Sequence, residues 1–190
     1  MVTLTEQDIY ELFQKNSLDR DRIEEDVVAK LSALGLKAAT AESCTGGLIS
    51  ERITRVSGSS AVFDCGVCSY ANFIKEKVLD VSSETLAVLG AVSAETSIQM
   101  AEGVKKLSGA DIAVSTTGIA GPTGGTAEKP VGLVYVGVCT AEKAYSVRLM
   151  LGGSESQPNS REQIRRLASD AALFNILSEC YAAEKAGDLP

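Results

Sequence analysis

The chain has 190 residues, enough for one compact domain that buries roughly two thirds of its unfolded surface in a single core. Its 18 basic and 25 acidic side chains give a formal charge of −7, and it has no lysine- or arginine-rich block, which argues against a nucleic-acid-binding surface. The chain contains no histidine, which excludes any catalytic mechanism with an imidazole base.

The cysteines indicate the redox environment of the protein, and the apolar runs indicate whether it contacts a membrane. Five cysteines, an odd number, lie mostly in apolar stretches, which is typical of reduced thiols in the cytoplasm. The pair in "CGVC", Cys65 and Cys68, has no second pair, and we interpret it as packing within a strand. The chain shows no secretory leader and no apolar run near the roughly 18 residues of a membrane span, so we expect a soluble protein without membrane contact.

The first half of the chain alternates helical and extended patterns. Residues 1–34 are charged and predict a weak helix followed by a firm one that Gly35 ends. The segment "LKAATAES" predicts a buried strand, residues 45–56 an amphipathic helix, and "AVFDCGVCSY" a second strand. A short helical or turn-rich stretch at 71–81 and helical segments near 83–89 and 94–107 follow.

The second half predicts the remainder of a sheet. A third strand, "DIAVSTTGIA", runs into the glycine- and proline-rich loop "GPTGGTAEKPVG". The next two strands, "LVYVGVCTA" and "AYSVRLML", resemble a hairpin, and a helix over 160–181 follows them. We therefore expect an α/β fold, a three-layer α/β/α domain over residues 35–182 with a mixed sheet of about five strands. Residues 1–34 form a helical extension in this prediction, and 183–190 a tail.

The corner "TAESCTGG", residues 40–47, presents a small nucleophile before paired glycines. Ser43 is expected at the end of a strand, where the amides of Thr45 and Gly46 open the next helix and stabilise a developing alkoxide. Serine also caps helices readily, and the residues alone leave both interpretations open. Cys44 is a rival nucleophile, but we expect it to face the opposite way and pack.

A serine nucleophile here needs a base other than histidine, which leaves lysine, a carboxylate or tyrosinate. A lysine accepts a proton only when neutral, which requires a pKa about three units below the ordinary value of about 10.4, as burial provides. Lys75 follows the second strand beside Phe73 and Ile74, and is the candidate base. A solvated surface charge is the alternative for Lys75, and a helix cap or ion pair for Glu42.

Three glycine-rich corners, at 43–47, 58–60 and 117–125, border strands at points where an open α/β sheet usually binds its ligand. The loop "GIAGPTGG" lacks the Gly-Lys-Ser/Thr ending of a phosphate-binding loop and does not match the dinucleotide fingerprint. ATP and NAD are therefore disfavoured as cofactors, and we expect no cofactor and no metal. Short corners of this kind suit a mononucleotide with a single phosphate.

Seven ordered blocks of this sequence resemble the family of the competence-damage-inducible protein's C-terminal domain: "TAESCTGG", "GSS", "SYANFIK", "GAVS", "TTGIAGPTGG", "KPVGLVYVG" and "NSREQIRRLA". The resemblance covers about residues 30–180, and stand-alone members of this family are nicotinamide mononucleotide amidohydrolases. It implies hydrolysis of nicotinamide mononucleotide to nicotinate mononucleotide and ammonia, a step of pyridine-nucleotide salvage. It also implies an α/β/α domain that self-associates as a homo-oligomer.

The resemblance assigns roles to individual residues. Ser43 resembles the nucleophile of the family and Lys75 its base. Tyr70, Ser60 and Thr117 match positions that line the nucleotide site. These roles imply a Ser-Lys dyad that acts on a small nucleotide.

Arg161, with Arg165 one turn later, resembles the arginine that contacts the substrate. Ala71 in "YAN" departs from relatives that often have serine there, which leaves any contact of that hydroxyl unfilled. Two alternatives remain at this point: a nucleotide-binding regulatory module of the same family without turnover, and an amidase for another small nucleotide or amide.

Overall fold

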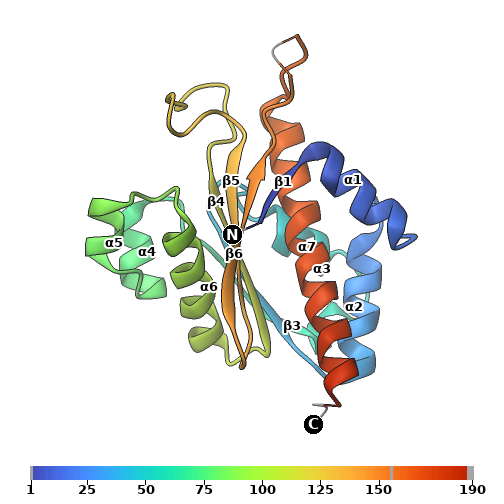
Figure 1. Ribbon diagram of the computed structural model, residues 1–190. Coiled ribbons are helices and arrows are strands. Elements are labelled where there is room, and N and C mark those ends of the chain that lie inside the picture. The colour runs from blue at the N-terminus through green and yellow to red at the C-terminus, as the bar shows by residue number, and fades with distance from the viewer. Residues whose placement is uncertain (1, 155, 188–190) are drawn as a thin grey trace.

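The computed structural model describes residues 2–154 and 156–187 and arranges them in three layers, a sheet between two layers of helices (Figure 1). The sheet has six strands in the order β1-β6-β5-β4-β2-β3. β5 pairs antiparallel with β4 and β6, and the other pairs are parallel. The strands are β1 (Thr3–Thr5), β2 (Ala38–Glu42), β3 (Phe63–Cys68), β4 (Ile112–Gly118), β5 (Leu133–Cys139) and β6 (Ala144–Met150). The predicted three-layer α/β/α class with a mixed sheet is confirmed.

Helices cover both faces of the sheet (Figure 1). One layer contains α1 (Glu6–Lys15), α2 (Ile23–Leu34), α3 (Leu48–Thr54) and α7 (Arg161–Ala186). The other contains α4 (Asn72–Leu79), α5 (Ser83–Val88) and α6 (Ala94–Ser108). A single 3₁₀ turn, Ser59–Ala61, precedes β3.

The N-terminal segment contributes a strand that the sequence did not predict. Residues Thr3–Thr5 form β1, which pairs in parallel with Arg148–Met150 of β6 and brings the sheet from about five strands to six. Three residues are too few for a periodic pattern, and the partner strand lies far along the chain, so no local signal marks β1. α2 packs against α7, so residues 2–34 form part of the same three layers and not a separate helical extension.

Local capping explains where the long helices begin and end. Gly35, with φ of 68°, ends α2 at the predicted position. Ser160 and Gln163 form a capping box at the start of α7, because each side chain accepts a hydrogen bond from the other residue's amide. α7 continues to Ala186, five residues beyond the predicted end at 181, and residues 188–190 of the predicted tail lie outside the described residues.

Two apolar cores flank the sheet. The larger core lies under α1, α2, α3 and α7, and the smaller one under α4, α5 and α6. In the smaller core α6 crosses α4 closely at Gly103, where an added Cβ would lie 2.0 Å from the carbonyl oxygen of Leu79. This close crossing positions α4, the helix that carries Lys75.

A buried ionic cluster links three helices of the same layer, α2, α3 and α7. The Arg52 guanidinium is fully buried and donates to the carboxylates of Glu24 at 2.8 Å and Asp170 at 2.7 Å. It also donates to the Ser169 hydroxyl at 3.0 Å and to the Arg20 carbonyl at 2.9 Å. These contacts satisfy a charge that would otherwise be costly to remove from water.

The carboxyl ends of β1, β2, β3, β4 and β6 meet at one edge of the sheet, because these strands run in the same direction. This is the edge at the top of Figure 1, where the loops over 119–132 and 151–160 also extend. Open α/β sheets bind their ligands outside this edge.

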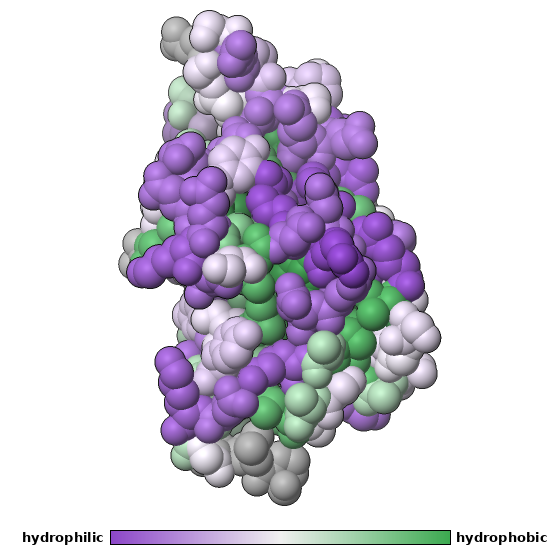
Figure 2. Space-filling model, turned by 90° about the vertical axis from the view of Figure 1, so that its right-hand side faces the viewer, coloured by the Kyte–Doolittle hydropathy of each residue, from purple (hydrophilic) through white to green (hydrophobic). Residues whose placement is uncertain are grey.

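Figure 2 looks onto the layer of α1, α2 and α7, which is mostly hydrophilic, with smaller hydrophobic areas between the polar side chains. Within residues 2–154 and 156–187, none of the helices combines the length and apolar character that a membrane crossing requires.

The ionic cluster generates a stability prediction. Arg52→Met should lower the free energy of unfolding by about 3–5 kcal/mol, because it leaves the Glu24 and Asp170 carboxylates without their shared buried partner. Urea denaturation measures this loss. The control Lys106→Met, which breaks the exposed pair with Asp80, should change stability little. Equal stabilities of the two variants would contradict the importance of the buried cluster.

Candidate active site

The side chains of Ser43 and Lys75 meet at the carboxyl edge of the sheet. Ser43 directly follows β2, and Lys75 lies in the first turn of α4, after β3. Lys75 Nζ lies 3.1 Å from Ser43 Oγ. The structure therefore brings together the predicted nucleophile and its predicted base, within the distance that proton transfer requires.

The surroundings of Lys75 favour a neutral amine. The side chain is fully buried, and its Nζ donates to the carbonyl oxygens of Ser69 at 2.6 Å and Tyr70 at 3.4 Å. None of the ion pairs among the described residues includes Lys75. Burial lowers its pKa below the ordinary lysine value, because the charged form loses hydration. The interpretation of Lys75 as a solvated surface charge is wrong.

The carboxylate of Glu42 caps α3. It accepts hydrogen bonds from the amides of Gly47 at 2.9 Å, Ile49 at 3.1 Å and Ser50 at 2.8 Å. The amino-terminal amides of α3 are therefore occupied by a protein carboxylate, as the capping interpretation of Glu42 predicted. The capping interpretation of Ser43 is wrong, because its Oγ faces Lys75 instead of this helix.

The turn between β2 and α3 is a tight loop, and α3 begins three residues later than predicted, at Leu48. Gly46 and Gly47 have φ angles of +62° and +94°, which exclude a regular helix at these positions. The amides of Thr45 and Gly46 donate to no protein group among the described residues. They thus belong to a turn beside Ser43 and not to a helix terminus.

Hydrogen bonds to three residues hold Thr45 in this turn. Its buried hydroxyl shares a hydrogen bond of 2.6 Å with the hydroxyl of Thr116 on the neighbouring strand β4. Its carbonyl accepts from Arg165, at 2.6 Å from Nη2 and 3.2 Å from Nε, and from the Leu48 amide at 3.3 Å. Arg165, predicted to bind substrate, thus contacts the protein backbone.

Arg161 is the first residue of α7. Its guanidinium donates to the Gly121 carbonyl at 2.9 Å and to the Tyr70 hydroxyl at 3.5 Å. Arg161 and Tyr70 are both exposed, so they border the site from the solvent side. The structure therefore brings both residues to the edge that Ser43 occupies.

The two other residues predicted to line the nucleotide site, Thr117 and Ser60, lie at opposite edges of the sheet. Thr117 follows the position on β4 that pairs with Glu42, so it lies beside Ser43, but its hydroxyl donates to the Ala91 carbonyl at 2.6 Å. Ser60 lies before β3, whose first residue pairs with Ala38 at the start of β2. Because β2 and β3 are parallel, Ser60 is at the amino edge of the sheet, opposite Ser43. The predicted placement of the 58–60 corner at the site is wrong.

The cysteines show no sign of a reactive thiol. Cys44 is buried, as predicted, and burial raises the pKa of its thiol to about 12. Cys65 and Cys68 lie on β3, and burial also raises their pKa values. All five cysteines are free. Cys44 therefore remains a packing residue beside the serine.

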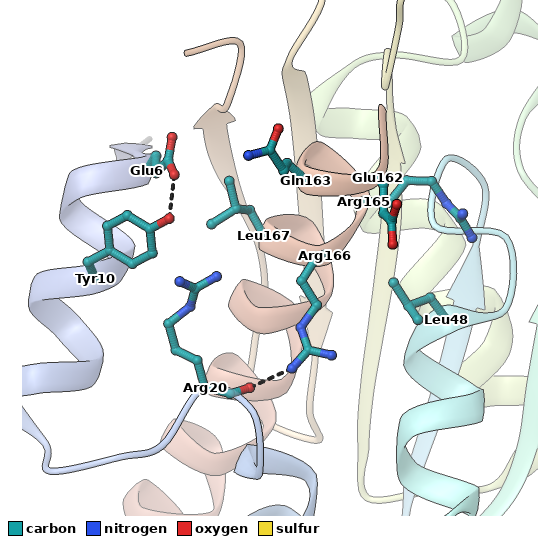
Figure 3. Close-up of a pocket in the computed structure, with 9 residues that line it drawn as sticks. All are labelled: Glu6, Tyr10, Arg20, Leu48, Glu162, Gln163, Arg165, Arg166 and Leu167. Carbon is teal, nitrogen blue, oxygen red and sulfur yellow. Dashed lines mark hydrogen bonds between the residues drawn. The ribbon is translucent and has the colours of Figure 1, made fainter. Parts of the chain in front are cut away.

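A separate cavity of about 370 Å³ lies between α1 and α7 (Figure 3). Several of its polar side chains bind protein groups: the Tyr10 hydroxyl donates to Glu6, Arg20 binds Asp170 at 2.7 Å, and Arg165 donates to the Thr45 carbonyl. The Glu6 carboxylate raises the pKa of the Tyr10 hydroxyl. Arg165 lines this cavity, but neither Ser43 nor Lys75 does, so the cavity does not contain the Ser43–Lys75 pair.

The charge at the carboxyl edge favours an anionic ligand. Five arginines pair with carboxylates, namely Arg20, Arg22, Arg52, Arg55 and Arg166. Within the described part of the chain Arg161 and Arg165 have no such partner. No group of three His, Cys, Asp or Glu side chains in residues 2–154 and 156–187 is arranged to hold a metal ion.

Some contacts at the site left no signal in the sequence. The carbonyls of Ser69 and Gly121 bind Lys75 and Arg161, and any residue type offers a carbonyl. The pairing of Thr45 with Thr116 depends on the register of β2 and β4. Ala71, the departure from relatives, is the residue before α4 and provides no side-chain cap, whereas a serine there is suited to cap the helix.

Comparisons with known proteins agree on one family. The model of the CinA C-terminal domain matches residues 20–180. A putative competence-damage inducible protein of Thermoanaerobacter pseudethanolicus is 52% identical over 151 residues, which are 80% of this chain and 37% of that protein. A CinA-like protein of Kosmotoga olearia is 51% identical over 141 residues, 74% of this chain and 34% of that protein. The chain thus spans little more than a third of these relatives.

Solved structures have the same fold. A competence/damage inducible protein from Agrobacterium tumefaciens is 39% identical, with a TM-score of 0.78 over 84% of this chain and 94% of that one. A CinA superfamily protein from Klebsiella pneumoniae is 30% identical, with a TM-score of 0.79 over 86% of this chain and 99% of that one. The domain of this chain therefore corresponds to nearly the full length of these crystallised proteins.

The capping assignment generates a stability prediction. Glu42→Gln should lower the free energy of unfolding by about 1–3 kcal/mol, because a buried charged acceptor of several hydrogen bonds is lost. Ser43→Ala should change it by less than about 0.5 kcal/mol, since the serine does not cap α3. Chemical denaturation of both variants checks this difference. A larger loss in Ser43→Ala than in Glu42→Gln would restore the capping role of the serine.

Proposed function

Because this chain belongs to the CinA C-terminal domain family, we propose that it is an amidohydrolase that converts nicotinamide mononucleotide and water to nicotinate mononucleotide and ammonia. The observation that carries the proposal is the 3.1 Å contact between Ser43 Oγ and the Nζ of a fully buried Lys75. Lys75 has no carboxylate partner among the described residues, and its pKa is lowered. These properties suit a base that activates a serine without histidine.

The first half of the reaction forms an acyl-enzyme. The neutral amine of Lys75 accepts the Ser43 proton while Oγ bonds to the carboxamide carbon, and the carbonyl oxygen becomes an oxyanion. The free amides of Thr45 and Gly46 bind this oxyanion. The C–N bond then breaks, and Lys75 returns its proton to the departing nitrogen, which leaves as ammonia.

The second half regenerates the serine. Lys75, again neutral, accepts a proton from water as the water oxygen bonds to the acyl carbon. The bond from this carbon to Ser43 Oγ breaks, and Lys75 returns the proton to Oγ, which releases the carboxylic acid product. The same two side chains thus serve both halves of the reaction, and the hydrogen bond between them in the free protein places them in position for the first proton transfer.

Arg161 is suited to the phosphate of the nucleotide. It is exposed at the carboxyl edge, and in the described residues its guanidinium binds only a carbonyl and the Tyr70 hydroxyl, which leaves its charge available to an anion. The amides at the start of α3 already donate to the Glu42 carboxylate, so they are not available to bind the phosphate. Tyr70 and Gly121 of the 119–132 loop contact the same guanidinium.

The activity itself is the first test of the proposal. The protein should release ammonia from nicotinamide mononucleotide, and Ser43→Ala should release none above background while it still binds the nucleotide. Ammonia is measured by a coupled assay, and binding by calorimetry. Saturable binding without ammonia release by the unaltered protein would instead support the nucleotide-binding regulatory module, and turnover of a different amide would change the substrate.

The role of Lys75 generates a prediction about pH. The rate should rise as pH increases through the lowered pKa of Lys75, because only the neutral amine accepts the Ser43 proton. Lys75→Arg should lose about 10²–10⁴-fold in kcat, since arginine stays protonated. The profile of kcat against pH, with folding checked by circular dichroism, gives both results. Substantial activity in Lys75→Arg would show that the lysine acts as a charge and not as a base.

A further inference from the structure

We propose that Arg165 is a positioning residue for the oxyanion-binding turn: it holds the Thr45 carbonyl and thereby aims the Gly46 amide at the reacting carboxamide. The inference rests on the proposed acyl transfer at Ser43. It differs from the substrate contact that the family resemblance implies for this arginine.

The grip of Arg165 on the turn is specific. Nη2 and Nε donate to the same carbonyl oxygen, at 2.6 Å and 3.2 Å, which fixes the direction of the Thr45 carbonyl. Arg165 is partly buried, and it forms no ion pair with a carboxylate among the described residues. The guanidinium charge is therefore directed at one peptide unit of the turn.

The planarity of that peptide determines where its amide points. The Thr45–Gly46 bond is trans, so the Thr45 carbonyl and the Gly46 N–H point in opposite directions. Arg165 approaches from α7 on one face of the sheet, whereas Lys75 approaches Ser43 from α4 on the other face (Figure 1). With its carbonyl held toward α7, this peptide directs the Gly46 N–H toward the side of Lys75.

The side chains that hold the rest of the turn do not contact the Thr45–Gly46 peptide itself. Gly47 is held by the Glu42 carboxylate, and the Thr45 side chain by Thr116. Neither contact involves the peptide plane between Thr45 and Gly46, whose carbonyl accepts one long backbone hydrogen bond, from the Leu48 amide at 3.3 Å. Gly46 has a φ of +62°, and glycine rotates easily between regions of the backbone map. Arg165 makes the shorter and charged contact that opposes rotation of this plane, and its charge also polarises the amide.

Figure 3 provides a matched control on the same helix. The Arg165 side chain points away from Tyr10 and Arg20, while Arg166 points toward Arg20, to whose carbonyl it donates at 2.9 Å. Arg166 also pairs with Asp21 at 3.1 Å, so it has no part in the turn. Substitution of Arg166 removes an arginine from the same helix without altering the contact to Thr45.

The kinetic test compares Arg165→Met, Arg165→Lys and Arg166→Met. Arg165→Met should lower kcat at least ~10-fold, toward the ~10²–10³-fold that loss of an oxyanion donor costs, with KM changed less than about threefold. Arg165→Lys, which retains one donor group, should be intermediate, and Arg166→Met should resemble the unaltered protein. In the inactive Ser43→Ala background, Arg165→Met should leave the Kd for nicotinamide mononucleotide unchanged. Retained kcat with weakened nucleotide binding would overturn the proposal and make Arg165 a substrate contact.

A second readout separates this inference from the identity of the substrate. A fluorophosphonate reacts with an activated serine: the Oγ–P bond forms, the P–F bond breaks with loss of fluoride, and Lys75 takes the proton. The phosphonyl oxygen occupies the oxyanion position, so Arg165→Met should slow labelling of Ser43 at least ~10-fold, and Arg166→Met should not. Thermal unfolding confirms that each variant is folded.

The outcomes of the two readouts are distinguishable. Labelling that depends on Arg165, in a protein that releases no ammonia from nicotinamide mononucleotide, would reject the proposed substrate and support the positioning role. Equal labelling rates in Arg165→Met and the unaltered protein would reject the positioning role, whatever the substrate. Absence of labelling in the unaltered protein would reject both.

Discussion

The contact between the buried amine of Lys75 and the hydroxyl of Ser43 depends on the whole architecture. The two residues follow neighbouring parallel strands, β2 and β3, so the sheet brings them to one edge. Burial lowers the pKa of Lys75, and the carbonyls of Ser69 and Tyr70 orient its nitrogen without adding a negative charge that would favour protonation. A nearby carboxylate would have the opposite effect, and the ion pairs of the described residues lie elsewhere.

Two charged side chains, one adjacent to Ser43 in sequence and one distant from it, support the turn that carries Ser43. Glu42 binds the amides that begin α3, and Arg165 binds the Thr45 carbonyl from α7. Both are protein contacts at positions where a ligand phosphate would otherwise be expected. Arg161, exposed and without a carboxylate partner among the described residues, is therefore the arginine that we propose for the anionic group of the substrate.

Much of this arrangement could be predicted from the sequence, and the exceptions share a physical cause. The strand before Ser43 has a strong local pattern, the segment of Lys75 is predicted only as a short helical or turn-rich stretch, and the resemblance of the ordered blocks implies the dyad. Strand β1 is too short for a periodic signal, and the position of Ser60 depends on the parallel pairing of β2 with β3. The grip of Arg165 on Thr45 joins residues that are 120 positions apart through a backbone atom, which no pattern of residue types reveals.

The most direct test of the central claim is the pKa of Lys75 itself, measured by NMR titration of its side-chain nitrogen in the folded protein without substrate. We predict a single titration well below the ordinary lysine value of about 10.4, and its loss in Lys75→Met. The same shift makes stability rise with pH between the lowered pKa and the ordinary value, because the unfolded chain holds that proton more tightly. A Lys75 nitrogen that titrates at or above the ordinary value would contradict the neutral base, and with it the Ser-Lys dyad.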